Sequence, residues 1–278
     1  MEVHIQLGTM RFSVNTEFGH NCAISQNFNE NQPNHFGAQH ALKESMVAGS
    51  FIGDTEKGGS CNVSTITLNP HCNGTHTESI RHICDASAPL SVAIGDIALP
   101  PMLPCVLISV APESARDCGD DYTPAFDEGD SVITRQTLEQ ALSQYNNDQL
   151  TAVAIRTLPN NAEKQNAVYD EENQPTFFTR DAILYLNERG TEHLIVDIPS
   201  IDRLHDDGLL TCHHLFWQVF ENTHHPAQHS LVNKTITEMA YFDNMLVDGF
   251  YMLSLQFPAF DLDAAPSKPV LFPTNRID

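Results

Sequence analysis

Apolar and polar positions follow different patterns in the two halves of the chain. Residues 14–60 are rich in Asn, Gln, Gly and Ser, which predicts loops around short strands such as Cys22–Ser25. The β-branched run Val63–Leu68 predicts a strand that ends at Asn69-Pro70. The most apolar stretch, Ser91–Ala111, contains an aspartate and three prolines, so it predicts two buried strands around a proline turn rather than a membrane span.

From residue 105 onward, strand patterns alternate with helix patterns. Strands are predicted at Cys105–Val110, Thr151–Thr157, His193–Ser200 and Gly249–Phe257. Helices are predicted at Thr134–Tyr145 and Thr179–Gly190, each with its threonine as N-cap, and within residues 208–220. The polar segments Asp117–Ser131 and Asn160–Pro175 predict surface loops.

The order of these elements predicts the fold class. Strand, helix, strand and helix in succession build a parallel sheet, whereas the pattern at Gly249–Phe257 is typical of an antiparallel strand. We therefore expect an α/β fold with a mixed sheet. The sequence contains no internal repeat and no clear linker, so a single domain over residues 1–278 is expected.

Charge and cysteine content narrow the class of protein. With 14 Lys and Arg against 36 Asp and Glu, the net charge of −22 argues against nucleic acid or an anionic membrane as partner. A hydrophobic content of 41% is enough to form a real core. The start of the chain lacks a basic, apolar leader, and the seven cysteines show no CxxC spacing, so we expect reduced thiols and a cytoplasmic location.

Histidine is unusually frequent, at 14 residues, and is unevenly placed. None lies between residues 83 and 192, and the two dense groups on either side suggest a metal site built from two chain segments. Any single histidine can equally be an ordinary surface residue. The segment 69–82 is the most informative, because it follows a strand and carries five candidate ligands: His71, Cys72, His76, Glu78 and His82. Imidazole, thiolate and carboxylate together suit zinc, with manganese as the alternative if the thiolate is not a ligand.

Four sequence blocks carry a family resemblance, and they occur in family order between residues 62 and 272. Gly74-Thr75-His76-Thr77-Glu78, with His82, resembles the HxGTHxDxPxH signature of the cyclase family of metal-dependent hydrolases, which includes kynurenine formamidase and isatin hydrolase. The other blocks that resemble the family are Arg189–Arg203, Cys212-His213-His214, and Thr237-Glu238 with the following segment 247–272. The resemblance implies a barrel-like mixed sheet with flanking helices, of the swivelling β/β/α type.

Site residues follow from the resemblance position by position. The metal ligands implied are Cys72, His76, Glu78, His213 and Glu238, and His82 is implied as the catalytic acid/base, assisted by Glu78. Three positions depart from the family: Cys72 replaces a histidine, for which His71 is an alternative, Glu78 replaces an aspartate, and Ile80 replaces a proline. His213 and His214 are both open as the ligand of the third block. Residues 221–235 are interpreted as an insertion, so the chain resembles a divergent branch of the family.

The function implied is metal-dependent hydrolysis of a C–N bond in a small amide, formamide or lactam, in the manner of an arylformamidase. One or two ions, Zn²⁺ or alternatively Mn²⁺, would activate water, and His82 would move the proton. A lactone or ring-opening hydrolase and a non-catalytic metal-binding member are the alternatives. The partners implied are a small-molecule substrate and further copies of the chain, in a homodimer or homotetramer.

Several other residues have weaker claims to a role in the site. Asp197 and Asp202 can support a ligand, although a role in a turn is favoured, and Arg156 can meet an anionic substrate. His35 and His40 can line the substrate pocket, although a surface loop is favoured. His224, His225 and His229 are expected to be solvated.

Overall fold

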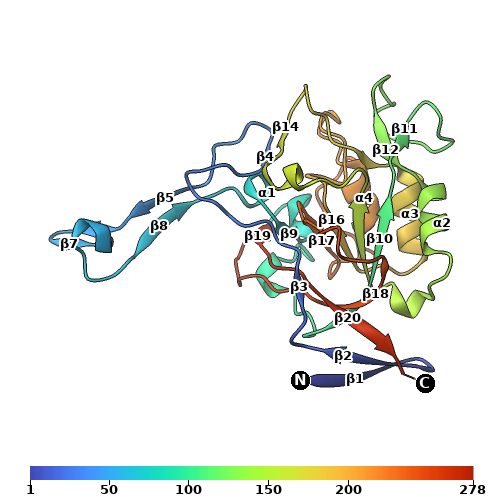
Figure 1. Ribbon diagram of the computed structural model, residues 1–278. Coiled ribbons are helices and arrows are strands. Elements are labelled where there is room, and N and C mark those ends of the chain that lie inside the picture. Colours follow the sequence, from blue (N-terminus) through green and yellow to red (C-terminus); the bar gives the residue numbers. More distant parts are fainter. Residues whose placement is uncertain (278) are drawn as a thin grey trace.

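One large mixed sheet organises the molecule. The computed structural model describes residues 1–277, and Figure 1 shows the sheet running through the body. Its strands follow the order β1 (Glu2–Leu7), β2 (Met10–Asn15), β20 (Val270–Arg276), β18 (Gly249–Ser254), β10 (Leu103–Val110), β13 (Ala152–Thr157), β16 (His193–Val196), β17 (Thr235–Glu238), β9 (His76–Glu78) and β19 (Ala264–Pro266). The short β3 (His20–Asn21) pairs with β20.

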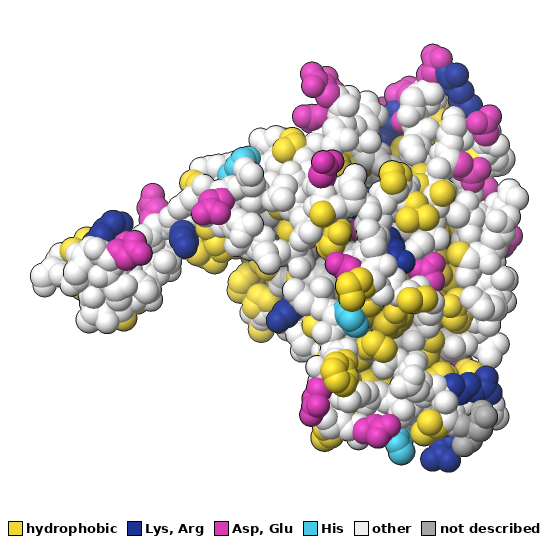
Figure 2. Space-filling view, viewed as in Figure 1, with side chains coloured by type: hydrophobic (Ala, Val, Ile, Leu, Met, Phe, Trp, Pro, Cys, Tyr) yellow, Lys and Arg dark blue, Asp and Glu magenta, His cyan; other side chains and the backbone are white. Residues whose placement is uncertain are grey.

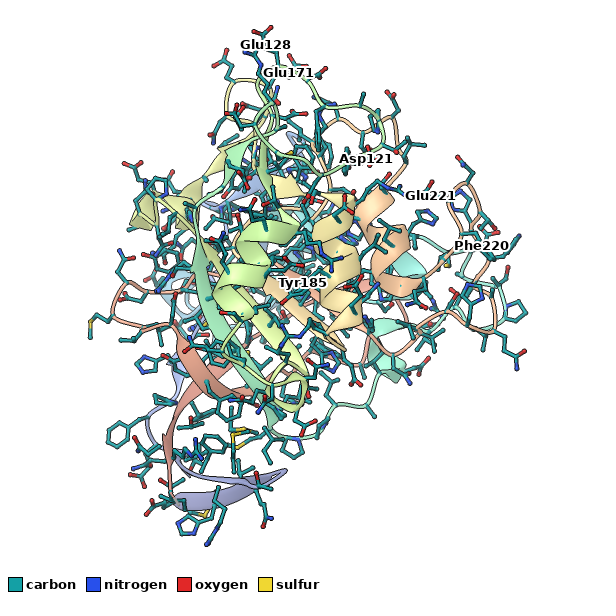
Figure 3. The ribbon with its side chains drawn as sticks, turned by 90° about the vertical axis from the view of Figure 1, so that its right-hand side faces the viewer. Asp121, Glu128, Glu171, Tyr185, Phe220 and Glu221 are labelled. Carbon is teal, nitrogen blue, oxygen red and sulfur yellow. The ribbon has the colours of Figure 1, made fainter. Side chains whose placement is uncertain are left out.

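The centre of the sheet is parallel and is covered by helices on one face. β10, β13, β16 and β17 pair in parallel, and the connections between them contain α2 (Arg135–Leu142), α3 (Arg180–Glu188) and α4 (Thr211–Trp217). Figure 3 shows the three helices side by side in front of the sheet. β18 and β9 flank this centre as antiparallel neighbours. The predicted α/β fold with a mixed sheet is therefore confirmed.

Side chains of the central strands alternate between two cores. On β10, Val106 and Ile108 face the core under the helices, whereas Cys105 and Leu107 face a second core. The second core is closed by residues of β18 and by the segment around Phe242. Because both faces are buried, the strands read as continuous apolar runs in the sequence.

The helix ends follow from local chemistry. The hydroxyls of Thr134 and Thr179 accept hydrogen bonds from the backbone N–H groups of Thr137 and Ala182, as the two predicted N-caps require. Gly190 follows α3 with φ of 78°, a left-handed conformation that glycine adopts without steric cost.

A long arm leaves the body, and it contains the predicted strand at Val63–Leu68. β8 (Ser64–Thr67) pairs with β5 (Leu42–Ser45), and β6 (Val47–Ala48) pairs with β7 (Phe51–Ile52) beyond them. A 3₁₀ turn, η1 (Thr55–Lys57), completes the arm. Figures 1 and 2 show the arm projecting from the rest of the molecule, with apolar side chains on its surface.

Two small sheets lie on other loops. One consists of β11 (Glu113–Ser114), β12 (Ser131–Ile133) and β15 (Phe177–Phe178), and the other consists of β4 (Asn34–His35) and β14 (Val168–Tyr169).

Two of the strand predictions were wrong in part. Only the second half of Ser91–Ala111 is a strand, β10, whereas the first half forms a single 3₁₀ turn, η3 (Ile94–Asp96). Its backbone bonds instead to the segment 260–262, and the prolines that follow cannot donate to a ladder. Cys22–Ser25 is not a strand either, and only Ala23 forms an isolated bridge, to Ala240.

Among residues 1–277, no helix has the length and apolar character needed to cross a membrane.

Candidate metal centre

The candidate centre lies where β17 ends and β9 runs antiparallel to it. Glu238, the last residue of β17, is directly opposite His76 of β9. His76 and Glu78 are two residues apart on a strand, so their side chains point to the same face. The carboxyl ends of parallel strands are where α/β folds place their sites. All three residues are at most 3% exposed.

One ring nitrogen of His76 faces Glu238 and makes no hydrogen bond. Its Nδ1 lies 3.0 Å from the carbonyl oxygen of Gly74. A carbonyl can only accept, so Nδ1 carries the proton and Nε2 keeps its lone pair. Nε2 is fully buried without a hydrogen bond, and it lies 3.4 Å from Oε2 of Glu238. A buried nitrogen without a partner reduces the stability of the fold unless a bound group, such as a metal ion, interacts with its lone pair.

His213 enters from α4 and is held by Asp202. Its Nδ1 donates to Oδ2 of Asp202 at 2.6 Å, which directs Nε2 to Oε1 of Glu78 at 2.8 Å. Asp202 also accepts the backbone N–H groups of Cys212 and His213, so one carboxylate caps the helix and orients the ring. A carboxylate behind an imidazole is the usual support of a histidine ligand.

His71, His82 and Asp263 form the more accessible side of the site. Oδ2 of Asp263 lies 2.8 Å from Nε2 of His71 and 3.2 Å from Nδ1 of His82. Nδ1 of His71 is 3.3 Å from Oε2 of Glu78, and Nε2 of His82 is 3.8 Å from the same oxygen. The two histidine side chains are about a quarter exposed, so they stand between the buried carboxylate of Glu78 and solvent.

Together these side chains have the composition of a metal site, and we call them the metal centre: His71, His76, Glu78, His82, His213, Glu238 and Asp263. Three groups have ligand atoms within 4.8 Å of one another: His71, His76 and Glu78; His71, His82 and Asp263; and Glu78, His82 and His213. Two buried atoms, Nε2 of His76 and Oε2 of Glu78, make no hydrogen bond. Imidazole and carboxylate are suitable donors for zinc or manganese, so the residues present fit a divalent cation.

Opposite charges in the centre shift the pKa values of its side chains. Burial on its own would raise the pKa of Glu78, but His82 and His213 outweigh it and hold that pKa well below its usual range. Burial likewise opposes protonation of His71, yet its hydrogen bond with Asp263 and the nearby negative charge of Glu78 raise its pKa to about 10. His71 and His82 in turn lower the pKa of Asp263 through their hydrogen bonds. Glu78 and Asp263 are thus held ionised, the state in which carboxylates bind metals.

Cys72 occupies a different position from its neighbour. The residue is 6% exposed, and its thiol belongs to none of the three groups of ligand atoms among the described residues. Burial and the charge of Glu238 raise the pKa of this thiol. The geometry therefore favours His71 over Cys72 as the ligand from this turn. Of the two neighbouring histidines on α4, His213 reaches Glu78, whereas Nδ1 of His214 lies 3.3 Å from the carbonyl oxygen of Val219.

The remaining candidates lie in varied positions. Asp202 supports His213, so the favoured prediction of a role only in a turn is wrong for this residue. Asp197 instead forms hydrogen bonds with Thr157 and Lys164 within the fold. Arg156 is 7% exposed and donates to Ser109, Asp243, Leu246 and Asp248, so its role is structural. The expected surface location holds for His40, His224, His225 and His229 but is wrong for His35, which is 3% exposed.

Asp263 is the site residue that the sequence reasoning missed. It immediately precedes β19, whose Ala264 is paired with Glu78, and its carbonyl oxygen accepts the N–H of Ser79. These contacts bring it beside His71 although the two are 192 positions apart. The signal was the Asp-Ala-Ala-Pro turn at residues 263–266, which lies inside a block that resembles the family.

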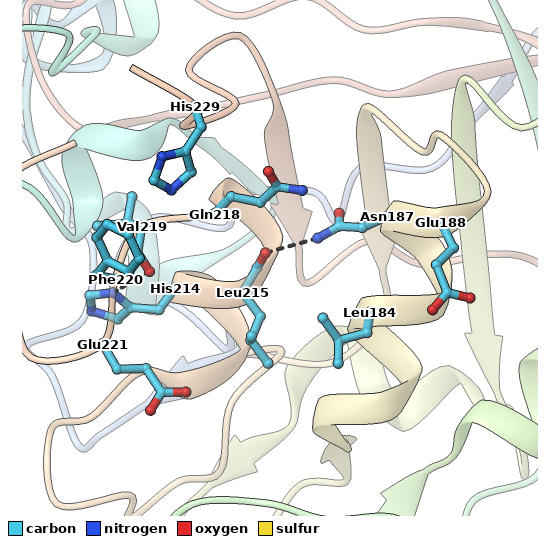
Figure 4. Close-up of a pocket in the computed structure, with 10 residues that line it drawn as sticks. All are labelled: Leu184, Asn187, Glu188, His214, Leu215, Gln218, Val219, Phe220, Glu221 and His229. Carbon is cyan, nitrogen blue, oxygen red and sulfur yellow. Dashed lines mark hydrogen bonds between the residues drawn. The ribbon is translucent and has the colours of Figure 1, made fainter. Parts of the chain in front are cut away.

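A large cavity on the outer side of the helices is separate from the metal centre. A cavity of about 810 Å³ lies between α3 and the segment after α4, and Leu184, Leu215 and Phe220 supply apolar surface there. Figure 4 shows His214 and His229 at this cavity. None of the seven residues of the metal centre lines it, so its size says nothing about the substrate of that centre.

Comparisons with known proteins identify the class to which this site belongs. The model of the cyclase family matches residues 22–203, more than half of the chain. The chain therefore belongs to the cyclase family.

Solved structures agree in fold. The chain is similar to a predicted metal-dependent hydrolase from Bacillus stearothermophilus, with a TM-score of 0.57, 16% identity and coverage of 92% of this chain and 98% of that one. It is similar to isatin hydrolase A from Labrenzia aggregata, with a TM-score of 0.57, 15% identity and coverage of 93% and 94%. A novel cyclase has a TM-score of 0.59 at 13% identity, with coverage of 93% and 89%. No curated protein matches the sequence significantly.

Proposed function

We propose that the chain is a metal-dependent hydrolase that cleaves a C–N bond in a small amide, formamide or lactam. The observation that carries the proposal is the pair of buried acceptor atoms without partners, Nε2 of His76 and Oε2 of Glu78, beside a partly exposed histidine. His71, His76, Glu78, His213 and Glu238 would hold Zn²⁺ or Mn²⁺. The cation would supply Lewis-acid polarisation of a carbonyl oxygen and a lowered pKa of water.

The protein side chains supply the proton transfers. Asp263 accepts from Nδ1 of His82, which leaves Nε2 of His82 as the atom facing Glu78 and free to take a proton. In the proposed reaction this nitrogen removes a proton from the attacking water. It then gives the proton to the leaving nitrogen as the C–N bond breaks, and the products are a carboxylic acid and an amine.

The supporting side chains keep this arrangement rigid. Asp202 fixes the tautomer and direction of His213, and Glu238 is held because its Oε1 accepts the N–H of Ile201 at 2.8 Å. Isatin hydrolases are among the structures of similar fold, which supports a lactam within the proposed substrate class. His82, partly exposed beside the buried cluster, supports a catalytic over a purely structural site.

Two variants separate metal binding from proton transfer. His76→Ala should lose bound metal and hydrolytic activity together, because it removes a ligand atom. His82→Ala should keep the metal and lose about 10²- to 10⁴-fold in kcat, the usual contribution of an acid/base group. Metal is measured by mass spectrometry on protein purified without chelator, and activity on a panel of isatin, aryl formamides and lactones.

The control and the contrary results are equally defined. His225→Ala, in a side chain that is 69% exposed, should change neither quantity. A fully active His82→Ala variant would remove the acid/base assignment. Wild-type protein that contains metal and hydrolyses nothing in the panel would favour a non-catalytic metal-binding protein, and faster turnover of lactones than of amides would favour the ring-opening alternative.

A further inference from the structure

His35 is a buried side chain that nothing in the fold explains. The residue is 3% exposed, and both of its ring nitrogens are buried without a hydrogen-bond partner. Among the buried histidines in residues 1–277, it is the one with both nitrogens in this state. Such an arrangement reduces the stability of the fold, because burial removes the water molecules that would otherwise form hydrogen bonds with the ring nitrogens.

The position of His35 relates it to the metal centre. β4, which contains His35, pairs with β14 and contacts α1 (Pro70–Asn73), the turn that carries His71. The side chain of Asn73 donates to the carbonyl oxygen of Gln39, which ties the same loop to that turn. The loop around His35 therefore covers the segment that supplies the first ligands.

The surroundings of the ring keep it uncharged and in place. Burial lowers the pKa of His35 to about 4, and the nearby His76 and His71 act in the same direction. The ring of Phe36 lies tilted against it at 4.0 Å between ring centroids, and Tyr169 meets the ring edge-on at 6.4 Å. A neutral imidazole offers one donor and one acceptor, and here neither is paired.

We propose that His35 contacts the substrate and hydrogen-bonds a second polar group, beside the bond that is cleaved at the metal centre. The inference rests on the proposed function and deepens it. The preferred substrate is then a small carbonyl compound with a further hydrogen-bonding group beside the scissile C–N bond. A substrate without that group leaves the buried ring unpaired and is discriminated against.

Replacement of His35 tests this directly, because a structural and a substrate-contacting histidine respond with opposite signs. His35→Leu removes two unpaired polar atoms, so the metal-loaded protein should unfold at the same or a higher temperature. Its kcat/KM for isatin should fall about tenfold, the effect of one lost hydrogen bond, and its affinity for thioisatinate in calorimetry should fall likewise. His35→Gln, which keeps a donor and an acceptor, should recover part of both.

His193 provides a matched control. It is also 3% exposed, and burial also lowers its pKa to about 4, but its Nδ1 is paired with the hydroxyl of Thr235 at 2.9 Å. His193→Leu should therefore lower the melting temperature and leave the KM for isatin unchanged.

Each other result has a definite meaning. If His35→Leu loses stability as His193→Leu does, or keeps full kcat/KM and affinity in an active enzyme, His35 is structural and the inference is wrong while the proposed function stands. If the wild type neither hydrolyses the panel nor binds thioisatinate, the proposed function fails, and the inference fails with it.

Discussion

At the scale of single residues, the turn that contains His71 and Cys72 shows how a site can keep its chemistry while its sequence changes. The resemblance places Cys72 at the position of a family histidine. In the structure, the neighbouring imidazole lies 3.3 Å from Glu78, and the thiol belongs to no ligand group within residues 1–277. A one-residue change along a short helical turn is enough to exchange the side chain that faces the centre.

This exchange can be tested with two variants. His71→Ala should reduce the bound metal strongly, because it removes an imidazole from two of the three ligand groups. Cys72→Ala should keep the metal content near that of the wild type. Metal content by mass spectrometry and melting temperature are measured for both. The reverse pattern, with metal lost only from Cys72→Ala, would restore the cysteine as the ligand.

At the scale of elements, α3, α4 and the start of β17 meet around a buried lysine. Nζ of Lys234 donates to the side chain of Asn187 on α3 and lies 4.3 Å from the ring centre of Phe216 on α4. Burial lowers the pKa of Lys234 to about 7, and the charge of Glu192 opposes the shift only in part. The packing of two helices on a strand therefore includes a group that titrates in the folded protein near neutral pH.

The stability of this junction should depend on pH with a defined sign. Between pH 7 and 10.5 the unfolded chain binds the proton of Lys234 more strongly than the folded chain, so raising the pH favours folding. Relative to Lys234→Met, the wild type should gain about 2 kcal/mol in free energy of unfolding from pH 7 to pH 9. Urea denaturation of both proteins measures this difference. A pH-independent difference would show that Lys234 titrates normally.

The sequence predicts most of the regular elements for physical reasons that are local. Thr134 and Thr179 are N-caps in the structure as expected, because a cap depends on residues three positions away. The wrong element, residues 91–99, is apolar without being a strand, since its hydrogen bonds go to residues 260–262. Asp263 is not predicted as a site residue for the same reason. Its partners His71 and His82 lie 192 and 181 positions away in the sequence.

At the scale of the whole molecule, the arm is the feature that the body does not explain. Val47 on β6 and Ile66 on β8 are 68% and 52% exposed. Exposed apolar side chains on a projecting hairpin suit contact with another chain. The homodimer or homotetramer expected from the family resemblance would provide such a contact.

Charged residues on the arm should therefore weaken self-association. The double variant Val47→Glu, Ile66→Glu should have a lower molar mass in size-exclusion chromatography with light scattering, and its circular dichroism should be unchanged. Glu56→Gln, on the same arm but polar in both forms, is the control. A wild-type chain that is monomeric at high concentration would contradict the expectation of an oligomer.

The metal centre also has a consequence for the chain as a polymer. Its residues come from β9 and its flanking turns, from α4, from the end of β17 and from the turn before β19, so they span residues 71 to 263. A cation held by them acts as a cross-link that closes loops of more than a hundred residues, and the chain entropy that such closure costs is met by the free energy of ligation. Metal supply would then set not only whether the enzyme works but also how long each molecule survives before it unfolds.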